Sequence, residues 1–328
     1  MKLGVFNPLF HDLSLEQTLD KLAGLGLDAI ELRTGPNSLK EIRSGAYPAQ
    51  QQCDPAALLA DAGKLRTFQN QFSQRKITIS ALSCHGNPLH PDRSQARTYH
   101  EAWRNSVLLA ERLGVKAVVV FSGCPAANAQ DTQPNWSIIG WPNEFGEMLD
   151  YQWNEACIPY WREQAQFARA HGVNIAVEMH PGFMVYNLPT MLRLREACGE
   201  NMGCNFDPSH LFWQQADPVA VIKALRGAIY HVHAKDTAFH AQNLARNGVL
   251  DNTEPAAERS WVFRSVGYGH GALDWRQMIS ALRITGYDHV VSIEHEDSYA
   301  SINEGLTKAV TFLQDIILRE QPAQSWWI

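Results

Sequence analysis

Several familiar signatures are missing from this chain of 328 residues. No run approaches the roughly 20 apolar residues of a membrane span, and MKLGVFNPLF lacks the apolar core and cleavage site of a signal peptide. The net charge of −6 gives no general attraction to nucleic acid or to an anionic membrane. The six cysteines form no CxxC pair, and there is no P-loop or dinucleotide fingerprint. We therefore expect a cytoplasmic protein with reduced thiols, no nucleotide cofactor, and neither a nucleic acid nor a membrane as partner.

What the sequence does contain is a repeated local pattern of amphipathic helix, glycine and apolar strand. It recurs in KLAGLGLDAIELR, AERLGVKAVVVF, ARAHGVNIAVEM and KALRGAIYHVHA. Glycine stands where each helix would end, because only glycine enters the left-handed region at little cost. The pattern predicts strands at 2–7, 28–33, 77–83, 116–122, 173–179, 203–207, 228–234 and 289–294. It predicts helices after Ser14 and near 97–113, 155–171, 189–198, 217–225, 274–285 and 302–319.

Eight strands alternating with helices favour an α/β fold of the (β/α)8 TIM-barrel type over an open doubly wound sheet. We expect one domain over 1–328 with long loops near 34–60, 123–154 and 236–273. The loop after the fourth strand is rich in aromatic residues, so we interpret it as a wall of the active site, with a subunit contact as the alternative. The tail ends in Trp326, Trp327 and Ile328, which favours a docked tail and a homo-oligomer.

Four of the apolar segments each end with a side chain that binds metals well. They are NIAVEMH with Glu178, GCNFDPSH with Asp207, AIYHVHAKD with His233 and HVVSIEHED with Glu294. Because a βαβ crossover needs a helix between parallel strands, the spacings place these residues at equivalent ends of successive strands. Active sites of (β/α)8 barrels lie at the carboxyl ends of the strands. Three carboxylates and one imidazole there predict a site for one divalent ion, which could be Mn, Mg, Co or Zn.

At these segments the chain resembles the xylose isomerase-like barrels, a group of sugar phosphate isomerases and epimerases. The group includes ketose 3-epimerases, inosose dehydratase and, more distantly, endonuclease IV. The resemblance runs from the first strand to Glu294, and its carriers are VEMHPG, NFDPSH, HVHAKD and SIEHED. It implies that Glu178, Asp207, His233 and Glu294 are the metal ligands. It also implies that His210 contacts the substrate, and that SCHGNPLHP with His85 and VGYGHGALDW with His270 line its pocket.

Two positions depart from the ketose 3-epimerases of this group. Those enzymes carry a substrate-binding Glu six residues after the first metal Glu and an Arg six residues after the metal His, where this chain has Met184 and Phe239. HVHAKD is more similar to inosose dehydratase, in which a Lys can meet a keto oxygen. An endonuclease would need three zinc ions and an extra His at the end of strand two, but that strand ends in Glu31 and Arg33.

The residues predict proton transfer at a carbon beside a carbonyl group of a sugar, polyol or keto-sugar. Glu178 and Glu294 could flank the substrate, one removing the proton and the other returning it, and His180 is a third candidate base. This predicts a metal-dependent isomerase or epimerase. If a hydroxyl or glycosidic oxygen leaves instead, the same site is a lyase that dehydrates a keto-inositol or cleaves a 3-keto-glycoside. A DNA-repair endonuclease and a non-enzymatic, metal-stabilised barrel are more remote alternatives.

In all, five residues are candidates for substrate binding: His210, Lys235, His85, Glu31 and His270. His85 and His270 could instead orient loops, and Lys235 could simply pair with Glu178 or Asp236. His231 precedes the metal-binding His by two residues, and we interpret it as a core residue or as a support for the site.

Overall fold

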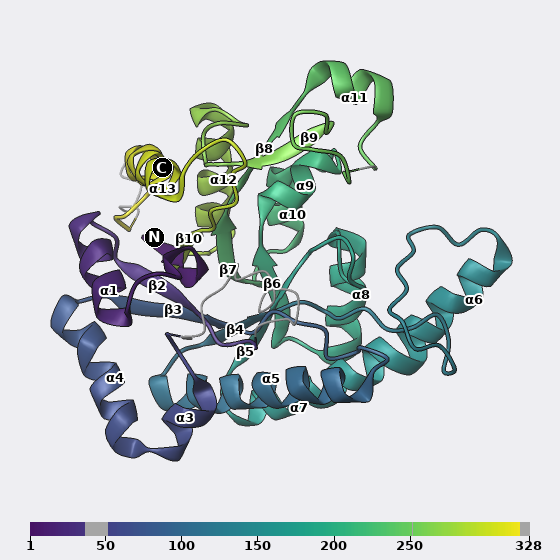
Figure 1. Ribbon diagram of the computed structural model, residues 1–328, viewed down its shortest axis with the longest axis horizontal. Coiled ribbons are helices and arrows are strands. Elements are labelled where there is room, and N and C mark those ends of the chain that lie inside the picture. Colours follow the sequence, from purple (N-terminus) through teal and green to yellow (C-terminus); the bar gives the residue numbers. More distant parts are fainter. Residues whose placement is uncertain (37–51, 251, 322–328) are drawn as a thin grey trace, which may run out of the picture.

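The computed structural model describes residues 1–36, 52–250 and 252–321, and their eight parallel strands close into a barrel (Figure 1). The strands pair in the order β1-β10-β7-β6-β5-β4-β3-β2. The sequence predicts all eight to within two residues at each end, so the (β/α)8 prediction is confirmed. Their bounds are Lys2–Phe6 (β1), Ala29–Arg33 (β2), Thr78–Ser83 (β3), Ala117–Val120 (β4), Asn174–Glu178 (β5), Met202–Phe206 (β6), Ile229–Ala234 (β7) and Val290–Ile293 (β10).

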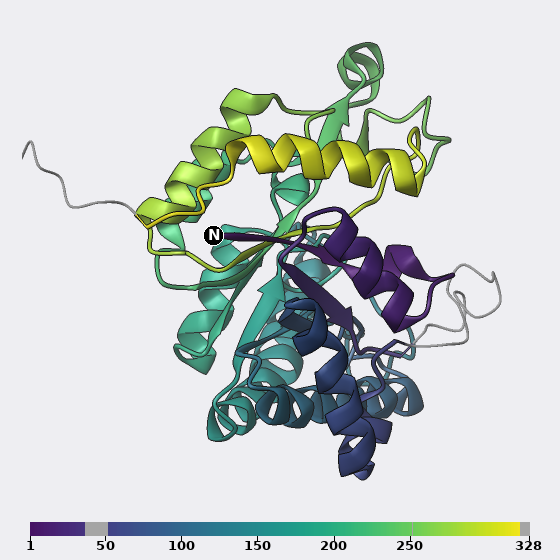
Figure 2. The same cartoon turned by 90° about the vertical axis from the view of Figure 1, so that its left-hand side faces the viewer.

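Helices surround the barrel on its outside (Figures 1 and 2). None of those in the described ranges is both long and apolar enough to cross a membrane. The main ones are α1 (Leu15–Gly24), α4 (Ala62–Arg75), α5 (Arg93–Leu113), α7 (Ile158–Ala170), α8 (Leu188–Cys198), α10 (Pro218–Ala224), α12 (Ala272–Ile284) and α13 (Ile302–Ile316). Short segments are η1 (Asn7–Phe10), α3 (Pro55–Ala60), α6 (Asn143–Tyr151), η2 (Gln152–Cys157), α9 (Pro208–Trp213) and α11 (Ala241–Asn247).

The barrel strands are buried on both faces, which explains why their sequences are apolar without alternation. On β4, Val118 and Val120 pack in the large cluster shared with the helices, whereas Val119 belongs to a separate small cluster with Ala176 of β5. Successive side chains of a strand point to opposite faces. One face therefore packs against the surrounding helices, and the other fills the barrel interior.

The predicted start of α1 is confirmed in atomic detail. The Ser14 side chain accepts a hydrogen bond from the Gln17 backbone N–H, and the Gln17 side chain accepts one from the Ser14 N–H. This reciprocal capping box satisfies two of the amide groups that the first turn leaves without a helical partner. The buried face of the helix, with Leu19 and Leu22, then packs against the barrel.

The long connections contain more regular structure than the sequence predicts. Residues 236–273 hold an antiparallel hairpin, β8 (Asp236–Phe239) with β9 (Trp261–Arg264), and the short helix α11. The connection after β4 holds α6 and η2 and projects away from the barrel (Figure 1). Helix α4 also escapes prediction, since its buried face consists of little more than Phe68 and Phe72. Residues 37–51 of the first long loop, residue 251 and the tail with Trp326, Trp327 and Ile328 lie outside the described residues.

Gly203 on β6 is a position without room for a side chain. A Cβ atom there would overlap the carbonyl oxygen of Ala228 and the ring of Tyr230. A Cβ on Gly24, within α1, would meet no atom within 4 Å. We predict that Gly203→Ala lowers the free energy of unfolding by about 1–3 kcal/mol through overpacking, whereas Gly24→Ala raises it by up to about 1 kcal/mol.

Urea unfolding followed by circular dichroism measures both changes. Equal stabilities of the two variants would contradict the tight packing of β6 against β7.

Candidate metal centre and active site

The four strand-end residues that the sequence singles out converge at one point. Glu178 is the last residue of β5, His233 lies on β7, and Asp207 and Glu294 directly follow β6 and β10. One donor atom from each lies within 4.8 Å of the other three. The Nδ1 atom of His233 is 3.1 Å from Glu294 Oε2 and 3.4 Å from Glu178 Oε2. Parallel strands of a barrel end at the same rim, so the fold itself brings these four residues together.

Other polar side chains surround this cluster. The ammonium group of Lys235 is 2.8 Å from Glu294 Oε2 and 3.0 Å from Asp207 Oδ2, and the side chain is almost fully buried. On the other side, His210 Nε2 lies 3.4 Å from Glu178 Oε1, and His85 Nε2 lies 3.1 Å from Glu178 Oε2. The structure thus brings together three of the predicted substrate-binding residues.

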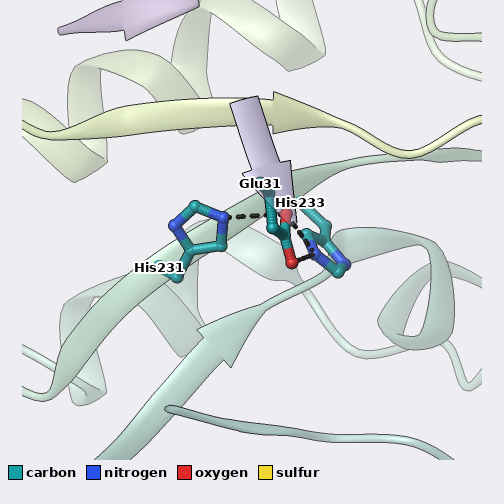
Figure 3. Close-up of side chains that lie close together, drawn as sticks. All are labelled: Glu31, His231 and His233. Carbon is teal, nitrogen blue, oxygen red and sulfur yellow. Dashed lines mark hydrogen bonds and ion pairs between the residues drawn. The ribbon is translucent and has the colours of Figure 1, made fainter. Parts of the chain in front are cut away.

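Next to the cluster, Glu31 of β2 lies between the imidazoles of His231 and His233 and contacts both (Figure 3). Its two oxygens lie 2.9 and 3.0 Å from His233 Nε2, and its Oε2 is 3.0 Å from His231 Nε2. Ser83 and Ser292 also donate their hydroxyl groups to this carboxylate. With Nε2 engaged by Glu31, Nδ1 is the ring atom that faces Glu178 and Glu294.

This arrangement corrects one prediction. Glu31 has no exposed surface, and both of its oxygens are engaged by protein donors. The prediction that Glu31 binds sugar hydroxyls is therefore wrong, because it supports the site from within the barrel. His231 is fully buried, as its interpretation as a core or supporting residue requires.

The electrostatics of the cluster favour ionised carboxylates. Burial alone would raise the pKa of Glu178, but the imidazoles of His210 and His85 beside its oxygens and the charge of His233 hold it well below its usual range. Burial would also raise the pKa of Glu294, yet Lys235 and His233 lower it to about 2. The same carboxylates raise the pKa of Lys235 despite its burial, so the ammonium stays charged.

His180 has a different environment. Burial, together with the neighbouring charge of His210, lowers its pKa to about 3. The two rings lie 4.2 Å apart between centroids, and the ring of Phe121 is 4.8 Å from that of His180. A neutral imidazole is therefore present beside Glu178 at neutral pH, the form that accepts a proton.

The donor set fits a divalent cation. Asp207 Oδ2 is buried, and beyond its ion pair with Lys235 Nζ at 3.0 Å it accepts no hydrogen bond from the described residues. His210 Nε2 is also buried and lies 3.4 Å from Glu178 Oε1 and 3.5 Å from Asp207 Oδ2 without the geometry of a hydrogen bond. Buried polar atoms are normally satisfied, so unsatisfied atoms at the centre of a cluster indicate a missing ligand. Three carboxylates and an imidazole are donors that Mn, Mg, Co and Zn accept. Glu178, Asp207, His233 and Glu294 are the residues that could hold such an ion.

Three cavities within the described residues adjoin the cluster, and the smallest, of about 190 Å³, touches it at Glu294. Of the other two, the smaller, of about 320 Å³, is lined by polar groups that include Arg33, His85, Glu294 and Glu296 and by aromatic rings that include Phe121 and Phe183. The larger, of about 710 Å³, begins at His180 and His210 and extends outward to residues of the projecting loop and the β8–β9 hairpin. Trp136 and Ile138 of the loop after β4 line this cavity.

His270 has structural partners. Its Nδ1 is 2.8 Å from Asp236 Oδ1, and its ring stacks on Phe212 with centroids 3.5 Å apart. Among the described residues it lines none of the three cavities. Asp236 also accepts hydrogen bonds from the backbone N–H groups of Gly267 and Gly269, so it organises the turn after β9.

The sequence reasoning missed Asn205. Its amide nitrogen lies 3.2 Å from Glu178 Oε2 and 3.1 Å from His233 Nδ1, linking two members of the cluster from β6. The signal was present, because Asn205 precedes Asp207 by two residues and alternate strand positions share a face.

Comparison with known proteins agrees with this architecture. A family model described as "Xylose isomerase-like TIM barrel" matches residues 19–316. An uncharacterised protein, YfiH of Bacillus subtilis, is 36% identical over 97% of this chain and 99% of its own length. Shorter matches are the rhizopine catabolism protein MocC of Rhizobium meliloti, 30% identical over 38% of this chain and 37% of its own, and an inosose dehydratase of Geobacillus thermodenitrificans, 26% identical over 45% and 49%.

Solved structures share the fold at low identity. They include the 3-keto-D-glucoside 4-epimerase YcjR of E. coli (TM-score 0.64, 13% identity, 96% of this chain and 99% of that one). The probable 3-DHS dehydratase AsbF of Bacillus anthracis has a TM-score of 0.62 at 18% identity, over 96% of this chain and 99% of that one. An IolI protein with a bound zinc atom has a TM-score of 0.62 at 19% identity, over 96% of both chains. On the match over residues 19–316, and with eight parallel strands closed into one barrel, this chain belongs to the xylose isomerase-like TIM barrel family.

Proposed function

We propose that this protein is a metal-dependent isomerase or epimerase that moves a proton at a carbon beside a carbonyl group of a sugar, polyol or keto-sugar. The observation that carries the proposal is the convergence of Glu178, Asp207, His233 and Glu294, with one donor atom of each within 4.8 Å of the others. Relatives named as epimerases and dehydratases support the same class of chemistry.

The four residues would hold the ion, and when bound it would act as a Lewis acid toward the oxygens of the substrate. Glu178 and Glu294 come from β5 and β10, on the two flanks of β6 and β7. Carboxylates on opposite sides of a substrate can serve as a pair: one accepts the carbon-bound proton, and the other, after taking up a proton from solvent, delivers that proton to the opposite face.

Three further side chains position these two carboxylates or place charge beside them. His85 and His210 hydrogen bond or lie close to the two oxygens of Glu178, which fixes the direction of its carboxylate. The ammonium of Lys235, next to Glu294 and Asp207, places positive charge where negative charge would develop on a substrate oxygen. The smaller cavity, with His85 and Glu294 in its wall, has the polar lining that a sugar requires.

Elimination by the same site is a second candidate. It needs one group beyond the proton-abstracting base, to protonate the oxygen that leaves. His210 lies 3.4 Å from Glu178 and lines the larger cavity, so it is the side chain placed to protonate a leaving oxygen there. With this group the site could dehydrate a keto-inositol or cleave a keto-glycoside.

The metal assignment predicts that Asp207→Asn loses its bound ion. Asparagine keeps the N-cap hydrogen bond that Asp207 accepts from the Ser209 N–H, so α9 is retained while the ligand charge is removed. Elemental mass spectrometry after incubation with Mn, Co, Mg or Zn compares the variant with wild type. Glu296→Gln, in a half-exposed residue outside the four-ligand group, is the matched control and keeps its ion. A wild-type protein that takes up none of these ions would overturn the assignment.

The support that Glu31 gives to His233 predicts a weaker but measurable effect for Glu31→Gln. Removing the charge that orients the ring weakens metal binding by about 10–100-fold, the usual effect of losing a partner of a metal-binding histidine. Chelator competition gives the dissociation constant, and thermal melting confirms that the variant is folded. Ser292→Ala removes one donor to Glu31 and leaves its charge, so we expect a smaller change. Unaltered affinity in Glu31→Gln would show that this carboxylate serves only the barrel.

The proton-transfer mechanism predicts that Glu294→Gln lowers turnover by about 10²–10⁴-fold at saturating metal, with little change in melting temperature. The assay uses a panel of ketoses, keto-inositols and keto-glycosides in D2O and follows deuterium entering the carbon beside the carbonyl group. Mass spectrometry of the products separates the two candidates, because an isomerase conserves the substrate skeleton and a lyase releases water or an alcohol. Deuterium exchange at the wild-type rate in the variant would rule out Glu294 as a proton carrier.

A further inference from the structure

The larger cavity is more than twice the volume of the sugar-sized one, about 710 Å³ against about 320 Å³. Pockets of roughly 300–1,000 Å³ enclose whole drug-sized ligands, so a free monosaccharide would leave most of this space empty. The volume therefore indicates that a second part of the substrate occupies this cavity.

The wall of this cavity includes five aromatic side chains among its fifteen lining residues. Trp136 comes from the projecting loop, Tyr186 from the β5–α8 connection, Trp213 from the end of α9, and Trp261 and Phe263 from β9. The rings of Trp213 and Trp261 are parallel, with an interplanar angle of 6° and centroids 4.6 Å apart. Flat rings of this kind favour an aromatic partner, since stacked or edge-to-face ring pairs gain energy beyond simple burial.

Some of the polar side chains in the wall are already used to hold the wall together. The amide nitrogen of Gln214 donates to the carbonyl oxygens of Tyr186 and His210. The carbonyl oxygen of Asn187 accepts from the backbone and hydroxyl groups of Thr190. Trp213 Nε1 and Asn252 Oδ1 are buried in this wall without a hydrogen-bond partner among the described residues, so they could serve one or two polar groups of a ligand. A second sugar unit would need a partner for each of its buried hydroxyls, so this lining suits an aromatic ring that carries few polar groups better than another sugar.

The cavity is continuous with the catalytic cluster. His210 lines it, and His210 Nε2 lies 3.4 Å from Glu178 Oε1 and 3.5 Å from Asp207 Oδ2. Phe263 also lines the cavity, and the Lys235 ammonium lies 4.8 Å from the centroid of its ring. His210 thus stands between the larger cavity and the carboxylates of the cluster.

We propose that this cavity, lined by Trp136, Tyr186, Trp213, Trp261 and Phe263, is a subsite for an aromatic aglycone, and that the substrates are aryl glycosides in keto form. The sugar lies over the four-residue cluster and in the smaller cavity, while the aryl group reaches past His210 into the larger one. This inference rests on the proposed function for the identity of the sugar end, but the subsite itself is tested by binding alone.

The test is isothermal titration calorimetry of the full-length, metal-loaded protein with phenyl and methyl D-glucopyranosides, in both anomers, and with cellobiose. We expect a phenyl glucoside to bind about tenfold tighter than the methyl glucoside of the same anomer, because the ring adds stacking and apolar burial. Trp213→Leu should bring phenyl binding to within about threefold of methyl binding, without changing the methyl value. Trp136→Ala, in the half-exposed loop, is a second variant that leaves the barrel intact.

Trp141→Leu is the matched control, since Trp141 is 78% exposed on the same loop and does not line the cavity. Equal binding of phenyl and methyl glucosides would overturn the proposal, as would cellobiose binding as tightly as the phenyl compound. A phenyl advantage that survives in both Trp213→Leu and Trp136→Ala would also overturn it.

The outcome is separable from that of the proposed reaction. A phenyl advantage without deuterium exchange on any keto-sugar would uphold the subsite and reject the chemistry. Exchange on free keto-sugars, with no phenyl advantage, would uphold the chemistry and reject the subsite.

Discussion

The interaction on which the site depends is the buried contact between Glu31 and His233. A carboxylate without solvent is costly unless charge and hydrogen bonds compensate it. Here two histidines of β7 and hydroxyl groups from β3 and β10 supply that compensation. Burial would raise the pKa of Glu31, but the charges of His233 and His231 hold it well below its usual range. The resulting network ties four strands together and leaves only Nδ1 of His233 for the adjacent cluster.

Beside this network, negative charge is in excess. Four carboxylates lie around the ammonium of Lys235, and imidazoles lie among them. The carboxylates are those of Glu178, Asp207, Glu294 and Glu296. Like charges at such short range repel strongly in a poorly solvated site. A bound divalent cation would offset that repulsion, so the arrangement is more consistent with a metal centre than with a purely structural salt-bridge network.

Much of this could be predicted from the sequence, and the rest could not for identifiable reasons. The barrel strands could be predicted because they are uniformly apolar segments that follow a glycine. The four metal-binding candidates could be predicted because each stands at the carboxyl end of such a segment. The hairpin β8–β9 was missed because its strands, DTAF and WVFR, are short and stand outside the pattern of helix, glycine and apolar strand that marks the barrel strands. Glu31 was misassigned because strand alternation places a residue on the inner face but does not give its depth. Its depth is set by the pairing of β2 with β1 and β3.

The hairpin also bears on specificity. By resemblance, ketose 3-epimerases use a Glu and an Arg where this chain has Met184 and Phe239. Met184 is buried, and Phe239 pairs across the hairpin with Trp261, a wall residue of the larger cavity. Directly opposed residues in an antiparallel pair share a face, so Phe239 extends the aromatic surface of β9. Two polar contacts expected for a free ketose are thus replaced by apolar side chains. Met184 packs in the hydrophobic core and Phe239 lies beside a wall residue, so both replacements argue against a free ketose as the substrate, while the aromatic subsite is argued from the volume and lining of the cavity.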